Sequence, residues 1–282
     1  MPLAYVIWGI GLLSYIAVSL LWSGNVSYQL ARNVTEAAQL EATVEATINR
    51  AVLGLLDGRY DRRWRVDGVA QEFSFGGAKV RVAIQDELGR IDLNHADGAL
   101  LAGLFQSVGL DSFSASRRVD KILDWRDSNG LKRLNGATAQ DYRAAGFAYG
   151  PRNGPFQSVD ELKLVMDMTP ELFRRVEPAL TVYSGRQFID PQFAPREALL
   201  ALPTMNADAA ASLIAARANQ ATGSSYSGTR AGVIDPIVPL QGRAFTIRAD
   251  IDKSAGTLSR EIAVRITDNP IQPYWVISWK AR

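Results

Sequence analysis

The length, composition and charge of the chain exclude several classes of protein. It has 282 residues, 47% of them hydrophobic and 21% charged, which is enough for one large folded domain or two small ones. Its 31 basic and 29 acidic residues leave a net charge of +2, which is not the basic excess of a dedicated nucleic-acid-binding protein. The absence of cysteine excludes disulfides, cysteine-ligated zinc and thiol catalysis, and the single histidine, His95, leaves little room for a histidine-based site.

The first segment of the chain is uncharged and apolar. No charged side chain precedes Arg32, and the apolar run from Pro2 to Trp22 matches the roughly 20 residues that a helix needs to cross a hydrocarbon core. The alternatives are a cleaved signal peptide, a buried core helix and a simple anchor with no further role. The run is too long for the first two, and no basic residues precede it as they would in a signal peptide. We therefore predict a transmembrane helix over residues 1–23. The flanking charges do not define its orientation.

The same helix is expected to continue beyond the membrane. Apolar residues recur from Val34 to Leu55 at spacings of three and four, the period of one face of an α-helix, and no proline interrupts them. Residues 24–57 are therefore predicted to form an amphipathic continuation of the helix, with Gly24 as a possible bend.

Strand patterns occur before and after a region of helical period. Residues 58–91 alternate between apolar and polar side chains, and Asp-Gly and Gly-Gly pairs predict hairpins between strands over 63–68, 69–77 and 78–87. Residues 243–282 predict three further strands. Because one amphipathic helix precedes both groups, we expect a single antiparallel sheet packed on that helix.

The region between the strands, residues 92–223, has a helical period. It contains a predicted capping box at Ser158–Glu161, a cap followed by proline at Thr169–Pro170, and a cap at Asn206. A Ser/Gly-rich loop is predicted over residues 224–242. The predicted fold class is therefore α+β, with a large all-helical insertion in a sheet domain.

The insertion contains a faint repeat. Residues 91–96 (IDLNHA) and residues 189–194 (IDPQFA) share Ile, Asp and Ala, and each run leads into a pair of leucines. The offset between Ile91 and Ile189 is 98 residues. Either the segment was duplicated, or similar turn chemistry arose twice.

Five strings in the chain are similar to the insertion of one known family. They are residues 86–97 (DELGRIDLNHAD), 124–137 (DWRDSNGLKRLNGA), 141–162, 168–185 and 194–203. Together with the long N-terminal helix and the split sheet, they resemble the minor pseudopilin of type II secretion systems called general secretion pathway protein K. The likeness extends over nearly the whole chain. It implies the pseudopilin fold, a long helix packed on an antiparallel sheet, with a large insertion.

The resemblance also implies a structural function without enzymatic activity. A minor pseudopilin of this kind caps the tip of the periplasmic pseudopilus and helps to initiate its assembly, for export of folded proteins across the outer membrane. The chain is then a single-pass protein of the bacterial inner membrane with its C-terminal domain in the periplasm. The implied partners are the other minor pseudopilins, the inner-membrane assembly platform, the prepilin peptidase, secreted substrates and the outer-membrane secretin, with no nucleic acid.

Two features near the N-terminus bear on this resemblance. Pseudopilins begin with a short basic leader that a prepilin peptidase removes, and no leader precedes Met1, so we expect either a sequence close to the processed form or a start further upstream. The family lacks the glutamate that other pilins carry near the mature N-terminus; here Tyr5 stands near that position. A carboxylate in lipid is costly unless it is paired, and in other pilins it pairs with the α-amine of a neighbouring subunit. A subunit without it is suited to the tip, with no subunit above.

One stretch of the insertion has the composition of a cation-binding loop. Oxygen-bearing side chains at spacings of three and two precede a glycine, which suits a hard cation, although the spacing is not that of an EF-hand. The resemblance implies calcium here, but Thr138 stands where relatives often carry an acid. The alternative is a helix C-cap followed by a polar turn. The predicted calcium ligands are Asp124, Asp127, Asn129, Asn135 and Asp141.

Other polar residues of the insertion have simpler interpretations. Glu87, Asp92 and Asp97 could form a second acidic cluster, although such residues more often cap helices, as Asn94 and Asp97 would here. His95 is interpreted as a turn residue. No nucleophile and base pair can be assembled from these residues.

Two helical segments resemble helix-hairpin-helix units, which bind DNA phosphates through glycine-rich turns. They are Val159–Pro178 and Pro195–Ala216. A membrane-anchored DNA-binding protein of the competence type is therefore the alternative function, but neither turn contains glycine, and Asp167 would repel phosphate. A membrane-tethered module that recruits secreted substrates is the other alternative.

Overall fold

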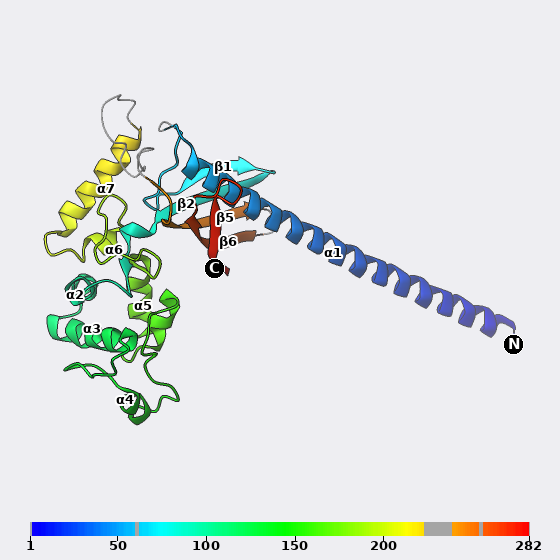
Figure 1. Ribbon diagram of the computed structural model, residues 1–282. Coiled ribbons are helices and arrows are strands. Elements are labelled where there is room, and N and C mark those ends of the chain that lie inside the picture. The colour runs from blue at the N-terminus through cyan, green and yellow to red at the C-terminus, as the bar shows by residue number, and fades with distance from the viewer. Residues whose placement is uncertain (1, 60–61, 223–238, 254–255, 282) are drawn as a thin grey trace.

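The computed structural model describes residues 2–59, 62–222, 239–253 and 256–281. Figure 1 shows three parts: a long N-terminal helix, a twisted sheet on which the end of that helix lies, and a group of helices on the side of the sheet away from the N-terminus. The predicted α+β class is confirmed.

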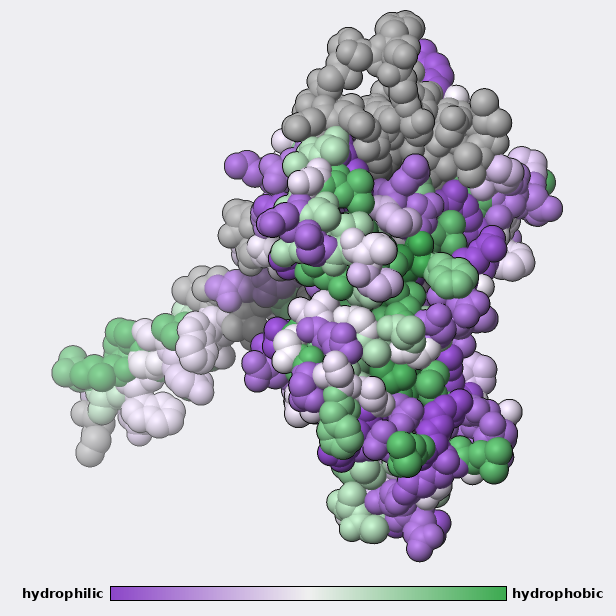
Figure 2. All heavy atoms as spheres, turned by 90° about the vertical axis from the view of Figure 1, so that its left-hand side faces the viewer, coloured by the Kyte–Doolittle hydropathy of each residue, from purple (hydrophilic) through white to green (hydrophobic). Residues whose placement is uncertain are grey.

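The N-terminal helix α1 (Pro2–Leu56) is continuous, as predicted, with no interruption at Gly24. The stretch Pro2–Ser19 is long and apolar enough to cross a membrane, and none of it is buried against the rest of the chain. Figure 2 shows this end of α1 extending away from the molecule, with apolar and weakly polar side chains. In the second half, Val44 and Leu55 mark the ends of a buried apolar stripe. The predicted amphipathic continuation is therefore confirmed.

The sheet has the order β1-β2-β5-β6-β7, and all of its neighbouring strands are antiparallel. Strand β2, before the insertion, pairs with β5, after it, and Asp86 lies opposite Phe245 at the end of that ladder. The insertion therefore leaves and rejoins the sheet at one end of two adjacent strands. The strands are β1 (Gln71–Phe75), β2 (Ala78–Asp86), β5 (Ala244–Lys253), β6 (Gly256–Ile266) and β7 (Tyr274–Ala281).

Five of the six predicted strands are confirmed, but residues 63–68 form no strand. Their only ladder contact is an isolated bridge between Asp67 and Gln85. The Trp64 N–H donates to the Gly54 carbonyl (2.9 Å) at the end of α1. Two bonds to β2, from the Gly68 N–H to the Ile84 carbonyl (2.9 Å) and from the Asp86 N–H to the Val66 carbonyl (2.7 Å), form only this one bridge.

The sheet and α1 share one hydrophobic core. The α1 stripe packs on the apolar face of β2, β5 and β6. Burying such a face contributes about 25 cal/mol per Å² of apolar surface removed from water. The main contributors are Val44, Ile48, Val52, Leu55, Val80, Val82, Ile84, Ile247, Ile251, Ile262 and Val264.

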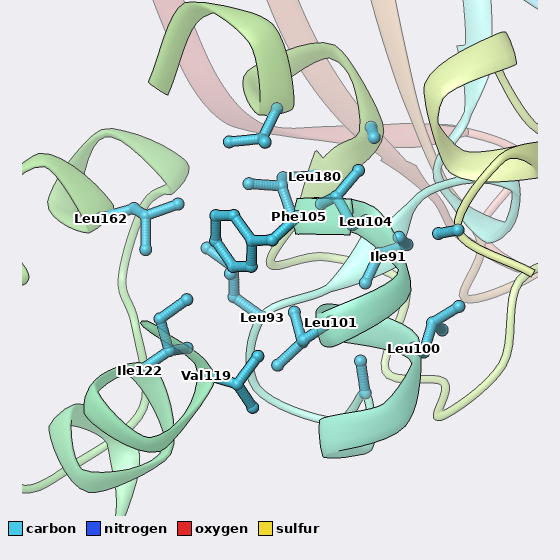
Figure 3. Packing of buried hydrophobic residues seen from close by; sticks show 14 of the residues in the cluster. Ile91, Leu93, Leu100, Leu101, Leu104, Phe105, Val119, Ile122, Leu162 and Leu180 are labelled. Carbon is cyan, nitrogen blue, oxygen red and sulfur yellow. The ribbon is translucent and has the colours of Figure 1, made fainter. Parts of the chain in front are cut away.

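The insertion has a second core, shown in Figure 3, where side chains of α2 and α3 point toward Ile91, Leu162 and Leu180. The insertion is helical except for a two-residue parallel ladder between β3 (Ile91–Asp92) and β4 (Leu180–Thr181). Its helices are α2 (Gly98–Ser107), α3 (Ser112–Arg126), α4 (Ala139–Ala144), η2 (Val159–Leu164), α5 (Pro170–Val176), η3 (Glu177–Ala179), α6 (Arg196–Leu199) and α7 (Ala207–Thr222), and the 3₁₀ turn η1 (Glu87–Gly89) precedes them.

Two of the three predicted helix caps are confirmed. The Thr169 hydroxyl caps α5 (3.2 Å to the Leu172 N–H), and Asn206 accepts from an N–H of α7 (2.8 Å). The capping box at Ser158 is wrong, because the Ser158 side chain makes no cap bond and the turn that follows is 3₁₀. The Glu161 carboxylate accepts from the indole of Trp125 (2.9 Å) and from the backbone N–H of Gln157 (2.9 Å), not from that of Ser158.

The faint repeat has a structural counterpart. In each copy an arginine from a later helix donates both terminal N–H groups to two carbonyls of the turn, Arg126 in the first and Arg217 in the second. This common closure favours duplication over chance. The carbonyl pairs are those of Leu93 and Ala96 and, 98 residues later, of Pro191 and Ala194.

Most of the loop predicted over residues 224–242 lies outside the described residues, which resume at residue 239.

Candidate functional site

The predicted cation loop follows helix α3 and folds back on it. Asp124 lies buried in the last turn of α3, and its carboxylate accepts from the backbone N–H of Arg133 (3.2 Å) and from its guanidinium (2.8 Å). Gly136 lies directly against the same carboxylate. A Cβ there would be 1.7 Å from Asp124 Oδ2, so only glycine allows this approach.

Asp127 and Asn129 lie beside Asp124. The Asp127 carboxylate accepts from the Asn129 backbone N–H (3.1 Å), from its side-chain amide (2.9 Å) and from Arg133 (3.2 Å). The Asn129 N–H bond, followed by the Arg133 contact, holds the pKa of Asp127 below its usual range. Three of the five predicted ligands are therefore brought together, with Arg133 between the two carboxylates.

The other two predicted ligands are engaged elsewhere. Asn135 donates its backbone N–H and its side-chain amide to Asp120 (both 3.0 Å). Asp141 caps α4, where it accepts from the Thr138 N–H (2.7 Å) and from Lys132 (2.8 Å). The Lys132 bond is the largest cause that lowers the pKa of Asp141.

Asp120 and Arg133 also hold this loop, although neither is among the predicted ligands. Asp120 precedes Asp124 by four residues, so both lie on the same face of α3. This spacing is visible in the sequence and could have indicated Asp120. The position of Arg133 has no such signal, because it depends on how the loop folds back.

The donor chemistry of this loop fits a hard cation, but its arrangement does not. Calcium takes six to eight oxygen ligands at about 2.3–2.6 Å. Here the guanidinium of Arg133 lies where a cation would bind Asp124 and Asp127. Within the described parts of the chain, no group of three or more acidic or histidine side chains is placed to hold a metal. Calcium binding therefore stays a prediction.

The second acidic cluster is not a joint site, because each member has its own partner. Glu87 pairs with Arg90 (3.1 Å), and Asp97 caps α2 through the Leu100 N–H (2.8 Å). The predicted cap by Asn94 is wrong, because its side chain bonds the backbone of Phe156.

Asp92, the third member, is buried at the end of β3. Its carboxylate accepts from the backbone N–H groups of Asn94 and Gly185 (both 2.8 Å), and His95 lies 3.2 Å away at an exposed turn. These contacts tie β3 to the segment after β4, which is a structural use of the carboxylate.

The turn of the first helix-hairpin-helix-like segment is built around Asp167. This residue has a φ of +68°, a conformation that usually favours glycine or asparagine. Its carboxylate pairs with the buried Lys121 and lies 3.7 Å from Arg117. The turn therefore presents a carboxylate where a DNA-binding turn presents N–H groups, and no observation favours the DNA-binding alternative.

The insertion is fixed to the end of the sheet by one buried ion pair and one aromatic ring. Asp86, at the end of β2, pairs with Arg243 just before β5 and also accepts from the Leu88 N–H (2.9 Å). Burial raises the pKa of Asp86 to about 6. Phe193 belongs to the insertion, yet it packs in the sheet core, and the Gln85 amide donates to its carbonyl (2.7 Å).

A second set of contacts joins the insertion to the sheet face opposite α1. Lys280 of β7 bonds Asp160 (2.5 Å), and Arg265 of β6 donates to the Tyr183 carbonyl (3.2 Å). The bonds from Lys163 and Lys280 lower the pKa of Asp160 to about 2. Between these contacts lies a cavity of about 310 Å³ whose lining carries charges of both signs.

The arrangement of α1 and the sheet defines a class of protein. A long N-terminal helix, apolar and free in its first half and packed on one face of an antiparallel sheet in its second, is the architecture of a pseudopilin. The insertion between β2 and β5 marks a particular subtype.

Comparison with known proteins gives two similarities. The model of the family described as "Type II secretion system (T2SS), protein K" matches residues 84–185. A chain of the GspK-GspI-GspJ complex from the type 2 secretion system of enterotoxigenic Escherichia coli has the same fold, with a TM-score of 0.63 and 13% sequence identity, over 89% of this chain and 99% of that one. No curated protein matches. The resemblance to type II secretion protein K, a minor pseudopilin, is confirmed. The single apolar helix of the described residues fits a single-pass inner-membrane anchor.

Proposed function

We propose that this chain caps the tip of a periplasmic pseudopilus and helps to initiate its assembly, for export of folded proteins across the outer membrane. The position of the insertion carries the proposal. It leaves and rejoins the sheet at the end between Asp86 and Phe245, and it lies away from the free half of α1 (Figure 1). A subunit stacked above would meet the insertion, whereas at the tip there is space for it.

The free half of α1 has two successive roles in this proposal. It first anchors the subunit in the inner membrane, with the rest of the chain in the periplasm, after processing by the prepilin peptidase. The assembly platform then extracts it into a bundle with the helices of other pseudopilins. The absence of a carboxylate near Tyr5 supports a subunit with no neighbour above.

The partners proposed first are other minor pseudopilins. The solved chain of similar fold comes from a complex that contains GspI and GspJ, which supports corresponding partners for this protein. The outer-membrane secretin and secreted substrates are further proposed contacts of a tip subunit. No catalytic function is proposed.

Cysteine cross-linking tests the tip position, because the natural chain has no cysteine. We expect Leu30→Cys, on the exposed side of α1, to cross-link to another pseudopilin in cells. Leu134→Cys, in the cation loop and 94% exposed, should cross-link to none. The cysteine-free parent is the control. Cross-links from position 134 to a pseudopilin of the shaft, or to one stacked above, would show that the tip position is wrong.

We also propose that calcium and Arg133 compete for Asp124 and Asp127. Removing the guanidinium should free both carboxylates, so Arg133→Ala should bind calcium about tenfold more tightly than the wild type in titration calorimetry. The matched control is Arg143→Ala, because Arg143 bonds a backbone carbonyl of its own helix. Equal affinities for the two variants, or no binding by either, would contradict this proposal.

A further inference from the structure

The C-terminal strand β7 is an edge of the sheet. It pairs with β6 along one side, and within the described residues no strand pairs with its other side. Alternate backbone N–H and C=O groups of an edge strand point outward, and another extended chain can bind them. β7 is eight residues long, which is enough for several such bonds.

The side chains of β7 are unusually apolar for an edge. Trp275 is 56% exposed, Val276 50% and Trp279 47%. Edge strands of soluble proteins are commonly protected by charged residues, especially lysine. The one charged side chain of β7, Lys280, is already bonded to Asp160 of the insertion. The strand thus exposes large apolar side chains without a free charge among them.

The opposite edge of the sheet is different. β1 has five residues, and Glu72 is charged and exposed. Its Phe73 ring is covered by Trp64, with ring centroids 5.9 Å apart, and by the guanidinium of Arg50 at 4.8 Å. Only Phe75 at its end is a large exposed apolar residue, at 43%. The exposed apolar surface is therefore a property of β7, not of sheet edges in this protein.

Helix α1 runs beside β7 and extends the same surface. The Tyr274 hydroxyl of β7 donates to Asn49 of α1 (2.9 Å), and Arg260 of β6 pairs with Glu41 of α1 (2.8 Å). Leu53, one turn after Asn49, is exposed. A chain lying along β7 would therefore also contact α1, the helix that packs against other pseudopilins in the proposed function.

We propose that β7, together with the Asn49–Leu53 side of α1, is the docking surface for an extended strand of a neighbouring minor pseudopilin. The open backbone edge selects a strand, and Trp275 and Trp279 supply aromatic contact area of the kind that dominates protein interfaces. Because the surface continues onto α1, the helix that packs against other pseudopilins in the proposed function, the partner is a pseudopilin rather than a secreted substrate. The identity of this partner rests on the proposed function.

Charge substitution on the edge tests the surface in the full-length chain. Val276→Lys places a charge on β7 and should reduce the amount of minor pseudopilin that co-purifies with the tagged protein by about tenfold. Phe75→Lys, on the opposite edge and similarly exposed, is the matched control and should leave co-purification unchanged. Both variants should keep the wild-type melting temperature, because both sites are exposed. Undiminished co-purification of Val276→Lys would overturn the proposal.

A cross-link identifies the occupant and separates this inference from the proposed function. Ile277→Cys should cross-link to a minor pseudopilin at a residue of one of its strands, as located by mass spectrometry. A cross-link to a secreted protein or to a second copy of this chain would overturn the docking proposal. If Leu30→Cys still cross-links to a pseudopilin in that case, the proposed function stands and only the β7 surface is wrong. If neither position reaches a pseudopilin, both fail.

Discussion

Single residues hold the insertion to the sheet, and Asp86 is the one with the most unusual environment. It is fully buried, and the Arg243 guanidinium and the Leu88 N–H offset only part of the cost of burying its charge. The carboxylate thereby joins β2, the first turn of the insertion and the entry to β5.

The raised pKa of Asp86 predicts a specific pH dependence. The folded chain keeps the proton up to about pH 6, whereas the unfolded chain releases it near the ordinary aspartate pKa of 3.8, so protonation favours the folded state between these values. Urea unfolding should therefore show this carboxyl adding about 1 kcal/mol of stability as the pH falls from 7 to 5. Asp86→Asn, which cannot titrate, should lack that increment. The same pH response in both proteins would contradict the prediction.

Phe193 gives a prediction about packing. Its ring lies in the sheet core although the chain around it belongs to the insertion. Phe193→Ala should lower the free energy of unfolding by about 3–5 kcal/mol, because it leaves a cavity between the two parts. Phe188→Ala, at an exposed position five residues earlier, should change it by no more than about 0.5 kcal/mol in the same denaturant titration. A small effect at Phe193 would mean that the two cores are not joined there.

The predicted calcium ligands also show what residue types alone can indicate. Asp124, Asp127 and Asn129 do come together, as their short spacing predicts. That spacing carries no information about Arg133, because the arginine reaches the carboxylates only after the loop has folded back on α3.

Among the elements, α2 and the turn that follows α6 make an unusually close contact. A Cβ on Gly103 would lie 2.1 Å from the Ala201 carbonyl oxygen, so the two backbones touch. Gly103→Ala should therefore destabilise the protein by about 2 kcal/mol, in spite of the higher helix propensity of alanine. Gly98→Ala is the control in thermal unfolding, since its Cβ would meet side chains only at 3.5 Å or more. Equal melting temperatures would show that α2 and this turn can separate without a loss of stability.

Elements with a clear period or turn signal were predictable, and those fixed by distant contacts were not. The α1 helix, the Gly76–Gly77 hairpin and the three C-terminal strands follow their local patterns. The strand expected over residues 63–68 and the capping box at Ser158 failed. In both cases a contact with another element competes with the local pattern: the Trp64 N–H bonds the end of α1, and the Glu161 carboxylate accepts from Trp125 of α3.

At the scale of the whole molecule, the apolar half of α1 is separate from the folded part. The stretch Pro2–Ser19 makes no buried contact, while the core begins near Val44. A fragment that starts at Ser27 should therefore remain soluble without detergent. Its melting temperature should lie within about 4 °C of the detergent-solubilised full chain, a difference worth less than about 1–2 kcal/mol. Circular dichroism measures both. An unfolded fragment would show that the span supports the fold.

What the sequence alone determined is the set of features that depend on near neighbours: the membrane-length apolar run, the helix that continues it, the Gly76–Gly77 hairpin and most caps. The family strings added the fold and the insertion. Only the tertiary structure decided that Arg133 stands between two predicted calcium ligands, that Phe193 enters the sheet core, and that β7 is an open apolar edge. The physical reason is the distance along the chain over which each interaction acts. Periodicity and turn chemistry act over a few residues. The Arg133 contacts depend on how the loop folds back on α3, and the other two features depend on contacts that exist only once distant segments are packed together.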